Sequence, residues 1–373
     1  MVDLLQRMVD LESPSRDGAS QEAIGTLVAD ELEALGLEVE RLPSEEFGDH
    51  LLARGPRRAD ATQLLVGHMD TVWPVGTTGE RPASVEDGRL TGPGSFDMKA
   101  GLVQMLHALR SAGELGLDLP ADPVVFVNTD EEVGSPDSRA HLEPLAREAR
   151  RAFVLEGSFG PSGHLKVGRK GVGRYRIAVT GVSAHAGLDP ASGSSAVLEM
   201  SHQIQRLFEL NDLERGITVN VGTVDGGLRP NVIAPEASAE VDVRVVTAAD
   251  AIEVDRALRD LTPVGDGVSV VVEGGFDRPP MEANDANMAL WEQARAAGES
   301  LGLDVGHAVV GGASDGNLTS AHTPTLDGLG AVGDGAHRVD EHVVVDAMVE
   351  RAALLTLLLA APLPGDRANG ASP

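Results

Sequence analysis

The sequence predicts an α/β fold in which a mostly parallel-sheet domain is interrupted by a smaller α+β domain. From residue 4 to about residue 171, short apolar runs alternate with segments of helical periodicity, as in βα units of a parallel sheet. From Gly173 to about Pro279, apolar residues alternate with polar ones, as in half-buried antiparallel strands. Helical periodicity then returns, so we expect residues 1–172 and 280–373 to form one discontinuous domain around an insertion of residues 173–279.

The elements of the discontinuous domain are placed by the period of their apolar residues. Consecutive apolar residues predict buried strands, and recurrence every three or four positions predicts helices. We expect strands at 64–66, 124–127 and 152–155, and helices at 21–35, 101–112, 287–301 and 343–359. The Gly-, Ala- and Pro-rich stretch after Pro362 is expected to be disordered.

The insertion has the β-α-β-β-α-β order of a ferredoxin-like fold. Its strands are expected at 175–179, 218–224, 237–246 and 268–273, and its helices at 196–210 and 249–261. The two helices would cover one face of the sheet. We expect the strand at 175–182 to lie at an edge, where it could pair with the same strand of a second subunit.

Composition excludes several classes of protein. The chain has no cysteine, so disulfides, thiolate ligands and thiol nucleophiles are ruled out. Its 58 acidic and 30 basic residues argue against nucleic acid or an anionic membrane as a partner. No apolar run reaches transmembrane length, and the amino terminus lacks the pattern of a signal peptide. We therefore expect a cytoplasmic protein with two domains, each with a substantial core.

The first candidate site is Gly67-His68-Met69-Asp70, at the end of the strand predicted at 64–66. Residues two apart in a strand face the same side, so His68 and Asp70 should lie together. An imidazole beside a carboxylate is how proteins build a transition-metal ligand and its orienting partner. A buried histidine capped by a neighbouring acid would explain this segment equally well.

Further acidic or histidine positions follow strands or lie in glycine-rich loops. They are Asp97 before the helix at 101–112, Glu131 and Glu132 after the strand at 124–127, Glu156 after the strand at 152–155, and His337 in the loop 333–337. Each alone could be a solvated loop residue. The strand ends of an open α/β sheet line one crevice, however, and adjacent acids repel one another unless a cation lies between them. Together these residues predict a metal site.

The chain resembles the zinc-dependent aminoacylase/carboxypeptidase metallopeptidase family over nearly its whole length. The motifs that carry the resemblance are His68-x-Asp70, Asp97 before Met-Lys-Ala-Gly, the Asp-Glu-Glu triplet at 130–132 and Gly-Gly-Ala-Ser-Asp at 311–315. The family includes glutamate carboxypeptidase, acetylornithine deacetylase and succinyl-diaminopimelate desuccinylase. A glutamate at position 156, where other members carry aspartate, leans towards the glutamate-carboxypeptidase and deacetylase-like branches.

The resemblance implies two zinc ions per subunit. His68 and Glu156 would hold one ion, Glu132 and His337 would hold the other, and Asp97 would bridge them. Two imidazoles and three carboxylates suit zinc better than calcium or magnesium, although cobalt or manganese could substitute. Two zinc ions close together can lower the pKa of a shared water towards neutrality.

Three further features of the site are implied by the same resemblance. Asp70 would orient His68, and Glu131 would be the general base that takes a proton from water and passes it to the leaving amine. The peptide bond between Asp97 and Met98 would be cis.

The insertion carries residues that the resemblance assigns to substrate. His185 would reach the active site of the partner subunit and act as an oxyanion donor, and Asn231 and Arg244 match substrate-binding positions. Arg278, where the chain returns to the first domain, could clamp a carboxylate bidentately or form a surface salt bridge.

A glycine-rich loop provides the last candidates, Gly311, Gly312 and Ser314. Successive glycines let the backbone approach a ligand, and free N–H groups can bind an anion. The loop resembles the one that receives the substrate's terminal carboxylate in the family, although a plain tight turn would look the same.

The function implied is that of a homodimeric di-zinc hydrolase that cleaves a C-terminal peptide bond or the amide of an N-acyl amino acid. The resemblance to glutamate carboxypeptidase is closest. A small-molecule deacylase of the acetylornithine or succinyl-diaminopimelate type is an alternative. A metal-free binding or scaffold dimer with the same fold is a third, from a different class of protein.

Overall fold

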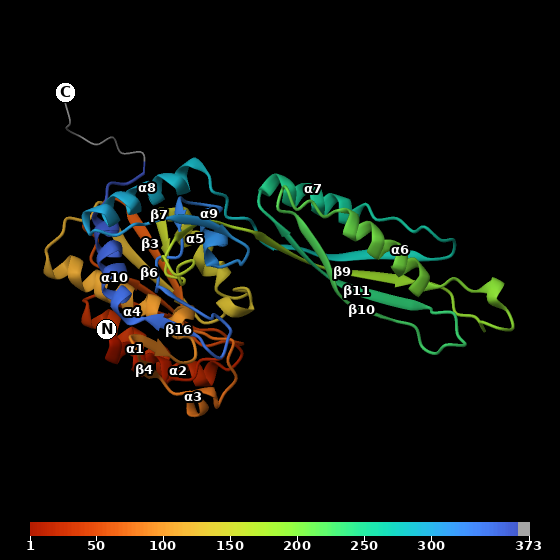
Figure 1. The fold of residues 1–373 in the computed structure, drawn as a ribbon, viewed down its shortest axis with the longest axis horizontal. Coiled ribbons are helices and arrows are strands. Elements are labelled where there is room, and N and C mark those ends of the chain that lie inside the picture. Colours follow the sequence, from red (N-terminus) through yellow and green to blue (C-terminus); the bar gives the residue numbers. More distant parts are fainter. Residues whose placement is uncertain (365–373) are drawn as a thin grey trace, which may run out of the picture. The chain divides into compact units, whose positions relative to one another are not determined.

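The computed structural model describes residues 1–364 and divides into two compact units (Figure 1). The first unit contains residues 1–168, 283–310 and 314 onward, and the second contains residues 169–282 and 311–313. The predicted tail after Pro362 lies almost wholly outside the described residues. The predicted fold class is confirmed, because one unit has a mostly parallel sheet and the other a ferredoxin-like α+β plan.

The first unit is built on a six-stranded sheet in the order β1-β2-β6-β3-β7-β14. These strands are β1 (Glu38–Leu42), β2 (His50–Arg54), β3 (Thr62–His68), β6 (Asp122–Asn128), β7 (Ala149–Val154) and β14 (Thr325–Leu326). Strand β3 pairs in parallel with β6 and β7, and β14 pairs in parallel with β7. Only β2 runs against its neighbours within this sheet. Parallel pairing brings the carboxyl ends of β3, β6 and β7 to one edge.

Helices cover both faces of this sheet, as its continuous apolar strands require. They are α1 (Val2–Val9), α2 (Gly18–Ala34), α4 (Ala100–Glu114), α5 (Arg139–Glu148), α8 (Asp285–Ser300), α9 (Asp315–Ser320) and α10 (Val345–Ala360), and a short helix α3 (Thr77–Glu80) follows β3. Leu65 belongs to a buried cluster with residues of α1, α2, α4, α8 and α10. Its neighbours Leu64 and Val66 belong to another with residues of α5 and α9, because successive strand residues face opposite sides.

Smaller sheets position the loops around the strand ends. A four-stranded sheet has the order β15-β16-β5-β4. Its strands are β4 (Ser84–Glu86), β5 (Arg89–Thr91), β15 (Gly333–Asp334) and β16 (His342–Val344). It places the loop of residues 335–341, between β15 and β16, beside the segment that follows β5 and leads to Asp97. A two-stranded sheet joins β8 (Leu165–Arg169) and β13 (His307–Val310).

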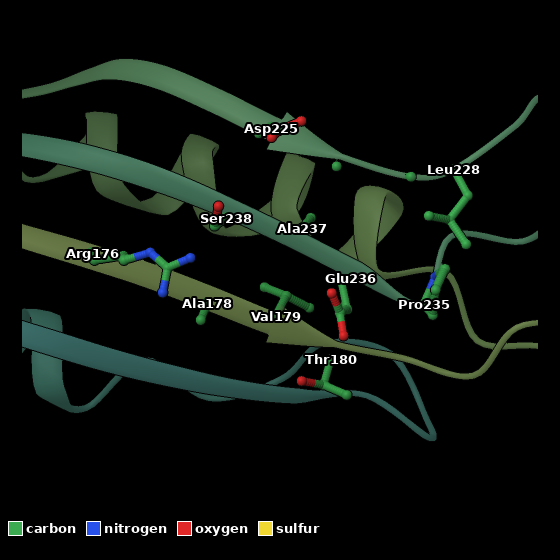
Figure 2. Close-up of a pocket in the computed structure, with 12 residues that line it drawn as sticks. Arg176, Ala178, Val179, Thr180, Asp225, Leu228, Pro235, Glu236, Ala237 and Ser238 are labelled. Carbon is green, nitrogen blue, oxygen red and sulfur yellow. The ribbon is translucent and has the colours of Figure 1, made fainter.

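The second unit has the predicted β-α-β-β-α-β order. Its elements are β9 (Gly171–Thr180), α6 (Ala196–Glu209), β10 (Thr218–Gly226), β11 (Glu236–Val245), α7 (Ala248–Arg259) and β12 (Ser269–Arg278). Both helices lie on one side of the sheet (Figure 1). Tyr175, Ile177 and Val179 of β9 are buried in the core of this unit. Arg176, Ala178 and Thr180 alternate with them and line the open hollow shown in Figure 2.

The prediction that the first strand of this unit lies at an edge is wrong. The sheet order is β10-β11-β9-β12, and β9 is paired on both sides. In a split β-α-β arrangement, the two strands of each half are separated by a strand of the other half, which places the first strand in the interior. The edges of this sheet are therefore β10 and β12.

Within the described residues, no helix is both long and apolar enough to cross a membrane.

Candidate metal centre

Five predicted ligands converge at the carboxyl ends of β3, β6 and β7. His68 Nε2 lies 3.3 Å from Asp97 Oδ1 and 3.4 Å from Glu156 Oε1. His337 Nε2 lies 2.9 Å from Glu132 Oε2 and 3.4 Å from Asp97 Oδ2. Asp97 therefore presents one carboxylate oxygen to each histidine and lies between two groups of donors.

The two neighbouring glutamates after β6 both reach this cluster. They begin a short 3-10 turn, Glu131–Val133. Ligand-type atoms of His68, Glu131 and Glu156 lie within 4.8 Å of one another, and so do those of His68, Asp97 and Glu132. Glu132 is the one that contacts His337. The tight turn thus gives adjacent acids different neighbours.

Asp70 orients both a histidine and this turn. Its Oδ1 lies 3.4 Å from His68 Nδ1, and the same ring nitrogen is 3.0 Å from the Asp70 carbonyl oxygen. The backbone N–H groups of Glu131 and Glu132 donate to Asp70 at 3.2 and 3.1 Å. The Ser15 hydroxyl also donates to it, at 2.7 Å. Sequence reasoning missed Ser15, because a lone serine far from the motif carries no signal.

Two glycines let the ligand-bearing segments approach one another. A Cβ at Gly67 would lie 2.7 Å from Leu102 Cδ2 and 2.8 Å from Met98 Cε. A Cβ at Gly101 would lie 2.0 Å from the Leu155 carbonyl oxygen. Only glycine permits these contacts, which bring the end of β3 and the segment before Glu156 against the start of α4.

The loops that carry Asp97 and His337 have unusual backbones. The Asp97–Met98 peptide bond is cis, as predicted. His337 has a φ of 62°, in the left-handed region that non-glycine residues seldom adopt. Glu341 accepts a hydrogen bond from the Asp97 backbone N–H and was not singled out from the sequence. The pair Asp340-Glu341 looks like a solvated charged turn, yet Glu341 is only 1% exposed.

Glu156 is supported by Arg351 of α10. The backbone N–H of Gly330 donates to the Glu156 carbonyl oxygen at 2.9 Å. The Arg351 guanidinium donates to the carbonyl oxygens of Gly330 and Gly163 at 3.0 Å, and also to that of Gly328. Burial lowers the pKa of Arg351 to about 10. This arginine fixes the loop beside a candidate ligand through backbone carbonyls.

The electrostatics show that the donors compete for protons. The hydrogen bonds that the His337 ring donates to Asp97 and Glu132 raise the pKa of His337 to about 10. Burial raises the pKa of Glu132 to about 7. Burial acts against ionisation of Asp97 too, but hydrogen bonds with His337 and His68 prevail and lower its pKa. Burial likewise opposes protonation of His68, yet hydrogen bonds with Asp70, Asp97 and Glu156 raise its pKa well above the ordinary value.

The donor set fits transition-metal ions. Two imidazole nitrogens and three carboxylates meet in a partly buried cluster, and the protons they share are those that a bound cation displaces. Mixed nitrogen and oxygen donors suit zinc and its transition-metal neighbours, whereas calcium and magnesium take oxygen donors.

Comparison with known proteins agrees with this geometry. The model of the Peptidase family M20/M25/M40 matches residues 64–361, which include every candidate metal ligand. The chain belongs to this family. It is therefore a metal-dependent hydrolase.

Relatives and solved structures of M20 proteins match along nearly the whole chain. Carboxypeptidase G2 from Pseudomonas sp. is 29% identical over 364 residues, covering 94% of this chain and 86% of that enzyme. Succinyl-diaminopimelate desuccinylase from Gluconacetobacter diazotrophicus is 30% identical over 363 residues, covering 90% of each chain. Aminopeptidase PepT from Bacillus cereus shares the fold with a TM-score of 0.79 at 22% identity, covering 96% of this chain and 97% of its own.

In this M20 chain, the second unit brings His185 and Asn231 together. His185 forms an isolated bridge with Val232, and the Ala186 backbone N–H donates to the Asn231 carbonyl oxygen at 3.0 Å. His185 Nδ1 accepts from the backbone N–H groups of Gly187 and Leu188, both at 3.1 Å. An accepting Nδ1 leaves the proton of a neutral ring on Nε2, which is then a donor.

Arg244 and Arg278 lie at the opposite end of the same sheet. Both are paired with Val172 at the start of β9, one from β11 and the other from β12. The Arg244 guanidinium makes two hydrogen bonds to Asp242, at 2.8 and 2.9 Å. Arg278 is 5% exposed. The structure therefore separates the predicted substrate residues into two pairs.

The glycine-rich loop is divided between the units. Gly311 and Gly312 belong to the second unit, where Arg169 donates to the carbonyl oxygens of Gly312 and Ala313 at 3.2 and 3.3 Å. Ser314 belongs to the first unit and is the N-cap of α9. Its hydroxyl donates to Asp327 at 2.6 Å and accepts from the Gly316 backbone N–H at 2.9 Å. The Ser314 hydroxyl is thus engaged in capping a helix.

Proposed function

We propose that this protein is a di-zinc hydrolase that removes a C-terminal amino acid from a peptide or N-acyl donor, in the manner of a glutamate carboxypeptidase. The observation that carries the proposal is the position of Asp97. One of its oxygens faces His68 and the other faces His337, so one carboxylate is shared by two sets of donors. Glu156 completes the first set and Glu132 the second. This division fits a dinuclear centre better than a single ion.

The chemistry assigned to the protein's own residues is proton transfer and orientation. A pair of zinc ions in this site would supply water activation and polarisation of the scissile carbonyl. Glu131 accepts the proton of the attacking water and later delivers it to the leaving amine. Asp70 keeps Glu131 in place through its backbone N–H, and keeps the His68 ring in one orientation.

Recognition of the substrate's carboxylate is assigned to the arginines of the second unit. A guanidinium matches a carboxylate with two parallel hydrogen bonds. Arg244 makes two hydrogen bonds to Asp242, and Arg278 is buried near the end of β12, so we keep both arginines as candidates for this role. Gly311 and Gly312 would add backbone N–H groups. Relatives named as a carboxypeptidase and as a desuccinylase support a substrate with an amide bond near a free carboxylate.

Metal analysis and a substrate panel test this proposal. The purified protein should contain two zinc ions per chain and hydrolyse N-acyl-glutamates or dipeptides faster than acetylornithine or succinyl-diaminopimelate. Preference for either of the last two would establish the deacylase alternative. A protein that binds no zinc and cleaves none of these compounds would instead be a scaffold with the family fold.

We also propose that the active site is composite and that the protein is a homodimer. His185 and Asn231 lie beyond the carboxyl end of β9, whereas Arg244 and Arg278 pair with its second residue. Strand β9 has ten residues, so roughly 25 Å or more separates the two pairs. One subunit cannot present both pairs to one small substrate. A second subunit would supply His185 and Asn231 to its partner's metal centre.

The surface available for that dimer is the β10 edge with the adjacent helix α6. In the described part of the chain, β10 pairs on one side only, with β11. Val224 on β10 is 56% exposed, and Val197, Leu198 and Phe208 on α6 are 45%, 60% and 49% exposed. An unpaired edge beside exposed apolar side chains is a surface that association about a two-fold axis would cover.

Mixing two inactive variants tests the composite site. His185→Ala and Glu131→Gln should each be nearly inactive alone. After subunit exchange, a mixed dimer holds one site in which both residues are intact, so activity should rise towards a quarter of the wild-type value, on the order expected from random assortment of two sites. Demonstrated exchange without recovery would show that His185 acts in its own subunit, and a His185→Ala variant that is active alone would show that His185 has no catalytic role.

A further inference from the structure

The carboxylate of Glu341 lies where three ligand-bearing segments meet. Its Oε1 accepts hydrogen bonds from the backbone N–H groups of Phe96 and Asp97 at 2.9 and 3.0 Å. Its Oε2 accepts from the backbone N–H of Gly94 at 2.9 Å and from the Trp73 indole at 3.3 Å. The side chain is buried, so four donors surround a carboxylate that is shielded from water.

Each donor belongs to a segment that carries a candidate ligand. Gly94, Phe96 and Asp97 form the turn that presents the shared carboxylate. Trp73 follows the His68-x-Asp70 motif, and its indole ring lies 4.0 Å from the Arg81 guanidinium carbon. Glu341 itself follows His337 through a turn in which its N–H donates to the Arg338 carbonyl oxygen at 3.2 Å.

We propose that Glu341 is a positioning residue that fixes Asp97 between the two metal ions. The inference rests on the proposed di-zinc function. A carboxylate shared by two ions must hold both oxygens at defined places, and the Asp97 backbone is held directly by Glu341 Oε1. The same side chain also accepts from Trp73, which follows the His68 motif, and Glu341 itself belongs to the segment of His337, so it sets the spacing of the two histidines relative to Asp97. It touches neither substrate nor the reacting atoms.

The geometry requires a carboxylate at this position. An amide in place of Glu341 would keep one accepting oxygen and put an NH₂ group opposite two N–H donors, which leaves those donors unsatisfied. Aspartate would keep the charge and both oxygens but is one methylene shorter. Asp340 provides a matched control, since it is adjacent, acidic and 60% exposed at the side chain, where it pairs with Arg338.

The test compares Glu341→Gln, Glu341→Asp and Asp340→Asn in the full chain. For Glu341→Gln we expect zinc affinity, measured by calorimetry, to fall roughly tenfold to a hundredfold, as for other partners of metal ligands. The visible absorption spectrum of the cobalt-loaded variant should also change, because the ligand geometry changes. Glu341→Asp should lie between Glu341→Gln and the wild type, and Asp340→Asn should match the wild type.

A purely structural role predicts a different result. The metal-free Glu341→Gln protein would then melt at a lower temperature, while its folded fraction would bind zinc and give a cobalt spectrum like the wild type, which would overturn the inference. If Glu341→Gln does not fold, Glu341→Asp decides between the two by the same spectrum. Failure of the wild-type chain to bind two metal ions would overturn the proposed function instead.

Discussion

The two units hold their candidate functional residues in different ways. In the first, ligands at strand ends are fixed by buried groups such as Asp70, Glu341 and Arg351. In the second, His185 lies on an exposed loop, and the arginines lie at the far end of β9. This difference fits our proposal that the metal chemistry is preorganised within one unit, whereas substrate recognition would be completed by a second subunit.

The largest effect is expected for Glu131→Gln. This substitution replaces the proposed general base of the first unit with an amide of nearly the same size and shape. Turnover should fall on the order of 10²–10⁴-fold or more, because a positioned general base is lost. Zinc content, measured by atomic emission, should remain two per chain. A variant that retains more than about a tenth of the wild-type rate would show that base and ligand are assigned to the wrong members of the Glu131-Glu132 pair.

A somewhat smaller effect is expected in the second unit for His185→Ala. Turnover should fall on the order of 10²–10³-fold, as when an oxyanion donor is removed, with no change in zinc content. The matched control is His322→Ala, whose histidine pairs with Glu143 on the outer surface of the first unit. If His185→Ala and His322→Ala have equal kcat values, His185 does not act as an oxyanion donor.

Arg278→Lys should change binding more than turnover. Lysine keeps the charge and loses the two parallel hydrogen bonds, so KM for a substrate with a terminal carboxylate should rise about tenfold to a hundredfold. Arg176→Lys is the control, since Arg176 is half exposed and lies near Glu240 and Glu273 on the open face of the sheet. If KM is unchanged while stability drops, Arg278 is a structural residue of β12.

The smallest effect concerns pH and the first unit alone. In the metal-free protein, the raised pKa of His337 gives stability that is present below its unfolded value of 6.5 and is lost as pH rises through about 10. Burial raises the pKa of Glu132 from 4.5 to about 7. Between those two pH values the folded state binds more protons at Glu132 than the unfolded state does, so the stability of the metal-free protein falls as pH rises through them. Zinc requires both groups deprotonated.

The melting-temperature difference between zinc-loaded and metal-free protein should therefore widen by several degrees between about pH 5.5 and pH 8.5. Scanning calorimetry with and without a chelator measures this difference. A gap that stays constant over that range would mean that these donors do not exchange protons for metal.

Much of the metal centre could be predicted from sequence because its residues follow buried strands. Parallel pairing carries the ends of β3, β6 and β7 to one edge, so local patterns at His68, Glu132 and Glu156 indicate a shared site. The position of β9 could not be predicted in this way. A strand with one face buried alternates in the same manner at an edge or in the interior, and its neighbours are chosen by pairing across the whole sheet.

Supporting residues escaped prediction for a related reason. Ser15 and Glu341 are far in the sequence from Asp70 and Asp97, the residues whose positions they support, and their own surroundings in the sequence are ordinary. Ser314 shows the reverse, since a motif position drew attention to a hydroxyl that caps α9. Local pattern identifies residue types that can do chemistry, and tertiary contacts decide which of them are occupied elsewhere.

The hydrogen bonds that Arg351 makes to the loop beside Glu156 have a consequence for the synthesis of the protein. Translation supplies His68, Asp97, Glu132 and Glu156 early, then the entire second unit, and only afterwards His337, Glu341 and the helix that carries Arg351. The second unit can complete its core on the ribosome while the first still lacks the loop supports and one ligand. We therefore expect metal uptake to follow synthesis of the loop that carries His337, and a product truncated before α10 to lack the hydrogen bonds that Arg351 makes beside Glu156.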